Sequence, residues 1–207
     1  MTRRVVGCMT GTSIDGIDAA LVDIEGSGLA MKPTFIRGVS HDLGPVRDPL
    51  RRLADQQPMT AADIAAAMHE FALVHVKTIR DLLNGDKCDL ICIHGQTVFH
   101  KPPLSWQLMQ PAPIAREFGV PVVFDLRAMD LAAGGQGAPI TPIADWILFR
   151  SPTNTAVVNL GGFCNITYLE ATSSPEAVRG RDICPCNNLL DAIARKLMGV
   201  PFDAEGA

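Results

Sequence analysis

The 207-residue sequence lacks any run of about 18 consecutive apolar residues, the length that a membrane-spanning helix needs. It also lacks a Lys/Arg-rich block, and its formal net charge is −4. A surface for nucleic acid or for an anionic membrane is therefore not expected. Residues 1–11 contain two arginines but no apolar stretch of signal-peptide length. We expect a cytoplasmic protein that binds neither nucleic acid nor a membrane.

A disulfide framework is also missing, because the cysteines are few and scattered through a chain of medium length. They are Cys8, Cys88, Cys92, Cys164, Cys184 and Cys186. Reduced thiols fit this spacing better than disulfides. The C-P-C run at 184–186 could suggest a metal, but two cysteines fall short of the four ligands of a structural zinc site.

What is present is an ordinary globular composition, 47% hydrophobic and 19% charged, enough for one or two domains with cores. Apolar alternation predicts three opening strands in an antiparallel meander, and strands and helices alternate after them. This order indicates a mixed α/β fold. Strands are predicted at 5–9, 17–24, 34–40, 89–93, 105–109, 120–124 (fully buried), 156–160 and 166–169.

Helix boundaries are marked by capping residues. Thr60 is a predicted N-cap with Asp63 as its partner three residues later, and this helix should end near Asn84. Further helices are predicted at 111–118 and 139–149. A last helix should be capped by Asn187 and stop at Gly199.

The arrangement "strand, glycine-rich turn, strand" occurs twice, at 5–24 and again from about 155. The repetition suggests two similar halves that face a cleft. We therefore predict a first domain over residues 1–154 and the start of a second over 155–207. The sequence closes on a polar, small-residue stretch, so the chain could be complete or the front part of a longer protein.

The first turn, "GCMTGTSIDGID" at 7–18, combines glycines, hydroxyls and two carboxylates between two strands. Glycine allows close backbone approach, and successive amide N–H groups can bind phosphate oxygens. The carboxylates Asp15 and Asp18 would repel phosphate unless hydrated Mg²⁺ lies between them. A plain polar hairpin turn is the alternative.

Two further motifs follow predicted strands, at the strand ends where function concentrates in α/β folds. "HGQT" at 94–97 is either a site lip or a structural histidine. In "DLRAMDLAAGGQGAP" at 125–139, Arg127 could bind a carboxylate and Asp130 could orient it, or the two could form an ordinary loop salt bridge. The glycine-rich run at 134–139 implies close backbone approach to a ligand or to a neighbouring loop.

The second glycine turn, Gly161–Gly162 in "VNLGGFCNIT", is either plain hairpin chemistry or a phosphate site. "GRDICPCNNLLD" at 180–191 then places Asp182 in a predicted loop before a helix. An aspartate in that position can act as a general base.

Together these motifs resemble the anhydro-N-acetylmuramic acid kinase family of bacterial cell-wall recycling. The family pattern G-x-M-[ST]-G-T-S-x-D-G-[IV]-D is matched at 7–18, and "HGQT" at 94–97. D-[FL]-R…D-x-A-x-G-G-Q-G-A-P is matched at 125–139, and N-[IL]-G-G-x-x-N-I-T at 159–167. The ordered motifs extend over essentially the whole chain.

The resemblance implies the sugar kinase, Hsp70 and actin ATPase superfold, with ribonuclease-H-like lobes of which the second is incomplete here. It implies an ATP- and Mg²⁺-dependent kinase that opens 1,6-anhydro-N-acetylmuramic acid and yields N-acetylmuramic acid 6-phosphate. A non-catalytic ligand- or partner-binding homologue and a kinase for another sugar remain alternatives. An incomplete second lobe should expose apolar surface, so a homodimer is possible.

The resemblance also implies residue roles. Asp182 would be the catalytic base for the attacking water, and Asp15 would reach Mg²⁺ through water. The sugar would be bound by His94, Gln96, Arg127, Asp130, Gln136 and Asn187. The nucleotide would be bound by Gly11, Thr12, Ser13, Ile14, Asp15, Gly16, Ile17, Asp18, Gly161 and Gly162.

The aspartate loop departs from the family pattern G-F-D-T-G-P-G-N. Here it reads "GRDICPCN", with cysteines at 184 and 186 in place of two glycines. If those glycines need positive φ, cysteine should strain the loop.

Overall fold

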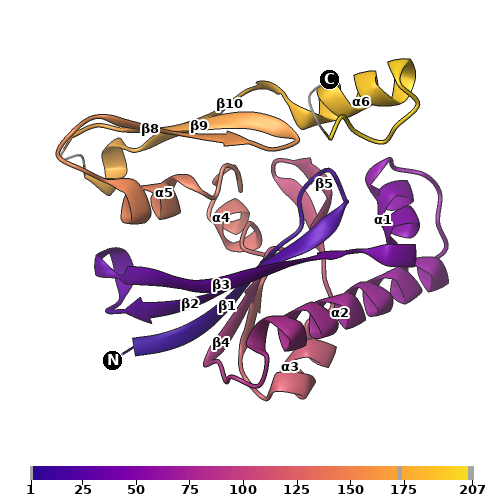
Figure 1. Ribbon diagram of the computed structural model, residues 1–207, viewed down its shortest axis with the longest axis horizontal. Helices are drawn as coiled ribbons and strands as arrows, with labels where there is room; N and C mark the ends of the chain where they lie inside the picture. Colours follow the sequence, from indigo (N-terminus) through magenta and orange to yellow (C-terminus); the bar gives the residue numbers. More distant parts are fainter. Residues whose placement is uncertain (1, 172–173, 205–207) are drawn as a thin grey trace. The chain divides into compact units, whose positions relative to one another are not determined.

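A computed structural model describes residues 2–171 and 174–204, which fold as two compact units, Met1–Ala138 and Pro139–Ala207. The sequence suggested a boundary at residue 154. The structure divides earlier because helix α5 (Pro142–Phe149) packs against the strands of the second unit. Figure 1 shows the elements of each unit.

The first unit is built on one five-stranded sheet with helices, together with a two-stranded hairpin. The sheet strands are β1 (Thr2–Met9), β2 (Gly16–Glu25), β3 (Lys32–Asp42), β4 (Leu90–Ile93) and β7 (Val122–Phe124). The hairpin strands are β5 (Gln96–Lys101) and β6 (Leu104–Leu108). The helices are α1 (Arg47–Ala54), α2 (Ala61–Leu83), α3 (Ala112–Phe118) and α4 (Ala128–Ala132), with 3-10 turns at Gly28–Ala30 and Gly44–Val46.

The strand order of the sheet is β3-β2-β1-β4-β7. β1, β2 and β3 are antiparallel neighbours, whereas β4 pairs parallel to β1, and β7 pairs parallel to β4. This mixed order confirms the ribonuclease-H-like lobe that the resemblance implies. The predicted antiparallel start is confirmed as well.

Helix α2 begins and ends where the sequence predicts. The Thr60 side chain accepts the Asp63 N–H, and the Asp63 side chain accepts the Thr60 N–H, which completes a capping box. The helix ends at Asn84, whose backbone is left-handed. α2 packs on the sheet beside α3 (Figure 1), and its fully buried Phe71 and Ile79 contribute to the core.

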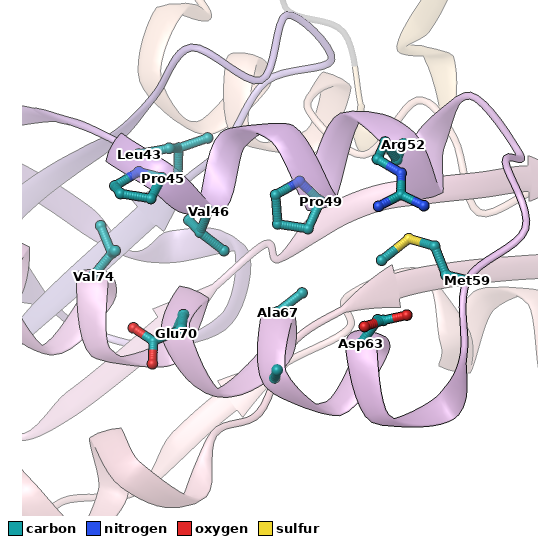
Figure 2. Close-up of a pocket in the computed structure, with 11 residues that line it drawn as sticks. Leu43, Pro45, Val46, Pro49, Arg52, Met59, Asp63, Ala67, Glu70 and Val74 are labelled. Carbon is teal, nitrogen blue, oxygen red and sulfur yellow. The ribbon is translucent and has the colours of Figure 1, made fainter.

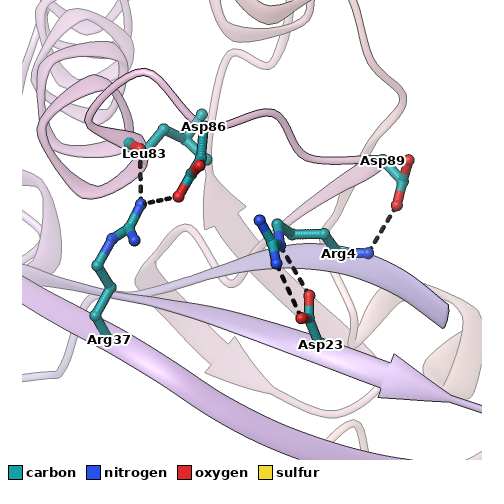
Figure 3. A network of polar contacts seen from close by, with 6 residues as sticks. All are labelled: Arg4, Asp23, Arg37, Leu83, Asp86 and Asp89. Atoms are coloured by element: carbon teal, nitrogen blue, oxygen red, sulfur yellow. Dashed lines mark hydrogen bonds and ion pairs between the residues drawn. The ribbon is translucent and has the colours of Figure 1, made fainter.

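Polar contacts connect strands β1, β2 and β3 with one another and with the segment between α2 and β4 (Figure 3). The Arg4 guanidinium donates to both carboxylate oxygens of Asp23, at 2.8 and 3.0 Å, and the Arg4 backbone N–H donates to Asp89. Arg37 on β3 donates to the Leu83 carbonyl and to the Asp86 carboxylate, each at 2.7 Å. These contacts hold the helix end and the strands in register.

The parallel pairing places the carboxyl ends of β1, β4 and β7 at one edge of the sheet. The β1–β2 turn, the "HGQT" motif and the 125–137 segment all begin at that edge. Three of the predicted motifs are thereby brought to one place.

The second unit has an antiparallel sheet of order β10-β9-β8. Its elements are α5, β8 (Thr155–Leu160), β9 (Phe163–Leu169), β10 (Arg179–Pro185), α6 (Asn187–Leu197) and a 3-10 turn at Pro175–Ala177. Thr167 on β9 donates to Asp145 on α5 at 2.6 Å. The unit leaves many apolar side chains exposed, among them Leu190 at 58% and Leu197 at 76%.

Three details of the sequence prediction are wrong. Residues 120–124 are not a fully buried strand, because β7 is the sheet edge and Phe124 is 44% exposed. Asp182 lies in strand β10 rather than in a loop, because residues 179–185 pair with β9. The N-cap of α6 is Cys186, and Asn187 is its first helical residue.

Among the residues that the structure describes, no helix is both long enough and apolar enough to cross a membrane.

Candidate functional site

The turn between β1 and β2 is held by an apolar residue in an unusual backbone conformation. Ile14 has a φ of 54° and is 1% exposed, so its side chain points into the core while its neighbours stay at the surface. Its N–H donates to the Gly11 carbonyl at 3.3 Å, which closes the turn. Left-handed backbone is costly for a β-branched residue and persists only where the surroundings impose it.

Two arginines of α1 bind the carbonyls of the same turn. Arg47 donates to the Asp15 carbonyl at 2.6 Å, and Arg51 donates to the Ser13 carbonyl. The sequence prediction missed α1 and both arginines. The signal available was their spacing of four residues, which places two side chains on one helix face. With its carbonyls bound from one side, the loop is fixed in shape.

The loop carboxylates are exposed, and each accepts a hydrogen bond from a serine hydroxyl. Asp15 accepts from Ser13 Oγ at 2.9 Å, and Asp18 accepts from Ser40 Oγ at 2.5 Å. The described part of the chain contains no cluster of three or more His, Cys, Asp or Glu side chains that could hold a metal. Mg²⁺ keeps several waters and needs only one or two carboxylates beside phosphate oxygens, so Asp15 suffices as a protein contact.

His94 follows β4 and is neutral in this structure. Its Nδ1 contacts the Gly95 carbonyl at 2.8 Å, so the hydrogen-bond network assigns the proton to Nδ1. Nε2 then accepts from Arg127 Nη2 at 3.0 Å. Burial lowers the pKa of His94, and the Arg127 charge lowers it further. His94 is therefore an acceptor that orients Arg127.

Arg127 and Asp130 bind opposite sides of one glycine. Arg127 Nη1 donates to the Gly137 carbonyl at 2.7 Å, and Asp130 Oδ2 accepts the Gly137 N–H at 2.7 Å. A Cβ at Gly135 would lie 2.3 Å from Asp130 Oδ2. The glycine-rich run therefore allows its own backbone to approach α4, which is the neighbouring-loop alternative of the sequence analysis.

Two buried polar side chains at this edge have atoms with no hydrogen-bond partner among the described residues: Gln96 Oε1 and Thr10 Oγ1. Gln96 is 0% exposed and donates from Nε2 to the Gly11 carbonyl at 3.4 Å, and Thr10 is 2% exposed. Buried polar atoms of this kind are normally satisfied. They are available to a ligand or to water. Gln136 is exposed on the glycine-rich loop.

The turn of the second unit is held by main-chain bonds instead. The Gly162 carbonyl accepts the N–H groups of Cys186 and Asn188, at 2.9 and 3.2 Å, and the Gly161 carbonyl accepts the Asn187 N–H at 3.0 Å. The Asn187 side chain donates to the Leu160 carbonyl at 3.4 Å. The start of α6 is thereby fixed against the Gly161–Gly162 turn.

Asp182 lies on β10 opposite Asn165, and its side chain is exposed. The register shifts between Asp182 and Cys184, so Ile183 is an extra residue in the strand. Neither Cys184 nor Cys186 has a positive φ, so the strain expected from replacing two glycines does not occur.

The structure thus brings the predicted residues together in two sets. The first-unit set comprises the β1–β2 turn with His94, Gln96, Arg127 and Asp130. The second-unit set comprises Gly161, Gly162, Asp182 and Asn187. A separate pocket of about 460 Å³ in the first unit contains neither set (Figure 2). It lies between α2 and the segment 43–52, is mostly apolar, and has Arg52, Asp63 and Glu70 among its lining residues.

Comparison with known proteins adds independent evidence. Residues 3–207 match the family model of anhydro-N-acetylmuramic acid kinase. A protein of that name from Salinibacter ruber is 38% identical over 99% of this chain and 56% of its own length. One from Gloeobacter violaceus is 39% identical over 98% of this chain and 57% of its own length.

The chain therefore spans about half the length of the curated relatives it matches. The match covers both sets of predicted residues, in the order in which the family pattern has them. The chain belongs to the anhydro-N-acetylmuramic acid kinase family.

Proposed function

We propose that this chain carries the phosphate- and sugar-binding residues of an ATP-dependent kinase of bacterial cell-wall recycling. Its substrate is 1,6-anhydro-N-acetylmuramic acid, its product N-acetylmuramic acid 6-phosphate, and its place of action the cytoplasm. Family membership supports the reaction class. The observation that carries the site assignment is the pair His94–Arg127 beside a phosphate-loop turn whose carbonyls are already bound by Arg47 and Arg51.

The turn at residues 10–18 binds the ATP phosphates through its amides and hydroxyls. Arg47 and Arg51 bind loop carbonyls from behind, which fixes the loop before the ligand arrives. A preorganised loop loses less conformational entropy on binding. Asp15 would hold a hydrated Mg²⁺ through water, and the ion would supply positive charge to neutralise the phosphates. The Gly161–Gly162 turn is the second nucleotide-binding element.

Arg127 binds the lactyl carboxylate of the sugar. A guanidinium suits a carboxylate because it donates two parallel hydrogen bonds. His94 Nε2 and the Gly137 carbonyl accept from Nη2 and Nη1, which fixes the orientation of that group. Asp130 contributes by fixing Gly137. Gln96, Gln136 and Asn187 supply amide groups for the sugar hydroxyls and the acetamide.

Asp182 is the general base. It takes a proton from water as the water oxygen attacks the anomeric carbon, and the bond between that carbon and O6 breaks. O6 takes the γ-phosphoryl group of ATP, and ADP leaves. A positioned base of this kind contributes about 10²–10⁴-fold to the rate.

The test is turnover by the protein with ATP, Mg²⁺ and 1,6-anhydro-N-acetylmuramic acid, followed as ADP and as sugar phosphate by mass spectrometry. Asp182→Asn should lower kcat by about 10²–10⁴-fold, with sugar and ATP binding retained in calorimetry. Glu170→Gln, an exposed acid on the same unit, is the matched control and should turn over normally. Equal kcat in wild type and Asp182→Asn would refute the role of Asp182. Binding without turnover by the wild type would indicate a non-catalytic member, and turnover of another sugar only would refute the substrate.

A further inference from the structure

Three of the six cysteines gather on the second unit. Cys164 lies on β9, Cys184 on β10, and Cys186 caps α6. The β9–β10 register places Cys184 directly opposite Cys164. Cys186 is tied to the same region, because its N–H donates to the Gly162 carbonyl at 2.9 Å.

We propose that Cys164 and Cys184 form a reversible cross-strand disulfide when the protein meets a peroxide. Directly opposed residues of an antiparallel pair have Cα atoms about 4.5–5.5 Å apart. A disulfide spans Cα separations of about 4.4–6.8 Å, and directly opposed residues fall within that range. The assignment concerns thiol chemistry and does not depend on the proposed kinase function.

The two thiols differ in exposure, which sets the order of the steps. Cys184 is exposed, whereas Cys164 is partly covered. Partial burial and the neighbouring Cys184 and Cys186 thiols raise the pKa of Cys164. The thiolate is the reactive form, so Cys184 reacts with peroxide first.

The reaction consumes one peroxide. The Cys184 thiolate attacks an oxygen of hydrogen peroxide, the O–O bond breaks, and a sulfenic acid and hydroxide form. The Cys164 sulfur then attacks the Cys184 sulfur, the S–O bond breaks, and a second hydroxide leaves. With the two thiol protons, the net products are one disulfide and two waters. An external dithiol reverses the reaction by exchange.

The crosslink would fix the irregular part of β10. Ile183 is the extra residue of the strand, and Asp182 precedes it. A bond from Cys184 to β9 removes freedom from this bulge. The first unit provides an internal contrast, because Cys8 is 5% exposed and burial raises its pKa to about 12. Cys8 should stay reduced.

The experiment treats the whole protein with graded hydrogen peroxide, blocks remaining thiols with N-ethylmaleimide and digests it with trypsin. Cleavage after arginine separates Cys164, in residues 151–179, from Cys184 and Cys186, in residues 182–195. The expected result is a crosslinked pair of these peptides, the loss of two thiols of six, and full reversal by dithiothreitol.

Cysteine-to-serine variants identify which two sulfur atoms form the crosslink. Cys164→Ser and Cys184→Ser should each abolish the crosslink, whereas Cys186→Ser should keep it. Circular dichroism checks that each variant is folded, and the wild-type crosslink needs no variant. A crosslink that survives Cys184→Ser but not Cys186→Ser would overturn the pairing. Loss of thiols to sulfinic acid without any crosslink, or six unreacted thiols, would overturn the proposal.

Discussion

The two glycine-containing turns of this chain look alike in sequence but are stabilised in different ways. The turn after β1 is held by side chains: Ile14 is buried beneath it, and arginines of α1 bind its carbonyls. The turn after β8 is held by main chain, because the first N–H groups of α6 donate to the carbonyls of Gly161 and Gly162. The rigidity of a glycine-containing turn therefore depends on which side chains and elements pack against it, and these differ between the two turns.

The sharpest difference is burial under the turn, and Ile14→Ala should have the largest effect on stability. Removing a buried isoleucine side chain costs about 2–5 kcal/mol of unfolding free energy. The matched change in the second turn is Leu160→Ala, where the side chain is 64% exposed. That change should cost within about 0.5 kcal/mol. Urea denaturation of both variants checks the comparison, and equal losses would contradict it.

The two units also differ in how closely the backbone of a glycine approaches neighbouring atoms. Gly135→Ala places a Cβ 2.3 Å from Asp130 Oδ2, and the overpacking should destabilise the first unit by about 1–3 kcal/mol. Gly161→Ala is the control, because the nearest atom to its Cβ is 3.6 Å away. Thermal and urea unfolding should be nearly unchanged in that control. A stable Gly135→Ala protein would mean that the loop lies elsewhere.

The units also differ in pH response, because all five histidines lie in the first. His75 is fully buried, and burial lowers its pKa from 6.5 to about 4. Since the unfolded state binds the proton more readily, stability is full above pH 6.5 and falls as the pH drops toward 4. The expected loss is about 1.4 kcal/mol per pH unit.

Urea denaturation at pH 6.5 and pH 5.0 measures this loss. His75→Leu should flatten the dependence in that window, while the exposed His69→Gln should keep the wild-type slope. His94 contributes in the same direction, since burial lowers its pKa too. An unchanged slope in His75→Leu would show that His75 is not the group responsible.

The smallest expected effect concerns the arginines behind the first turn. Arg51→Ala should raise the KM for ATP roughly threefold to tenfold, as expected for the loss of one hydrogen bond to the loop, with kcat little changed. Arg52→Ala is the control on the same helix, because Arg52 lines the separate pocket (Figure 2) and donates to the Pro58 carbonyl at 3.4 Å rather than to a carbonyl of the turn. Equal KM values in the two variants would show that the Arg51 contact does not support ATP binding by the turn.

The sequence predicts those features of the fold that depend on the spacing and alternation of nearby residues. The capping box of Thr60 and Asp63, the opening meander and the mixed α/β order follow from spacing and alternation, and the structure confirms them. The sequence placed two first-unit motifs directly after predicted strands, and the observed parallel pairing of β1, β4 and β7 brings them to one edge of the sheet. The possible homodimer remains a prediction.

What depends on tertiary contact could not be predicted. The edge position of β7, the Arg47 and Arg51 contacts, and the inward-pointing Ile14 are set by neighbours distant in sequence. The sequence "GRDICPC" shows no clear alternation of apolar and polar residues, so it predicts a loop at Asp182. Residues 179–185 nevertheless pair with β9 as a strand. The roles of the candidate site residues remain proposals.

In the proposed function, the edge of the first-unit sheet binds both the ATP phosphates and the sugar. Hydrogen–deuterium exchange with mass spectrometry on the protein tests it directly, with MgATP and with 1,6-anhydro-N-acetylmuramic acid added separately. We expect slower amide exchange at residues 10–18 with MgATP, and at 94–97 and 127–137 with the sugar. Unchanged exchange in these segments at saturating ligand, with protection elsewhere, would contradict it.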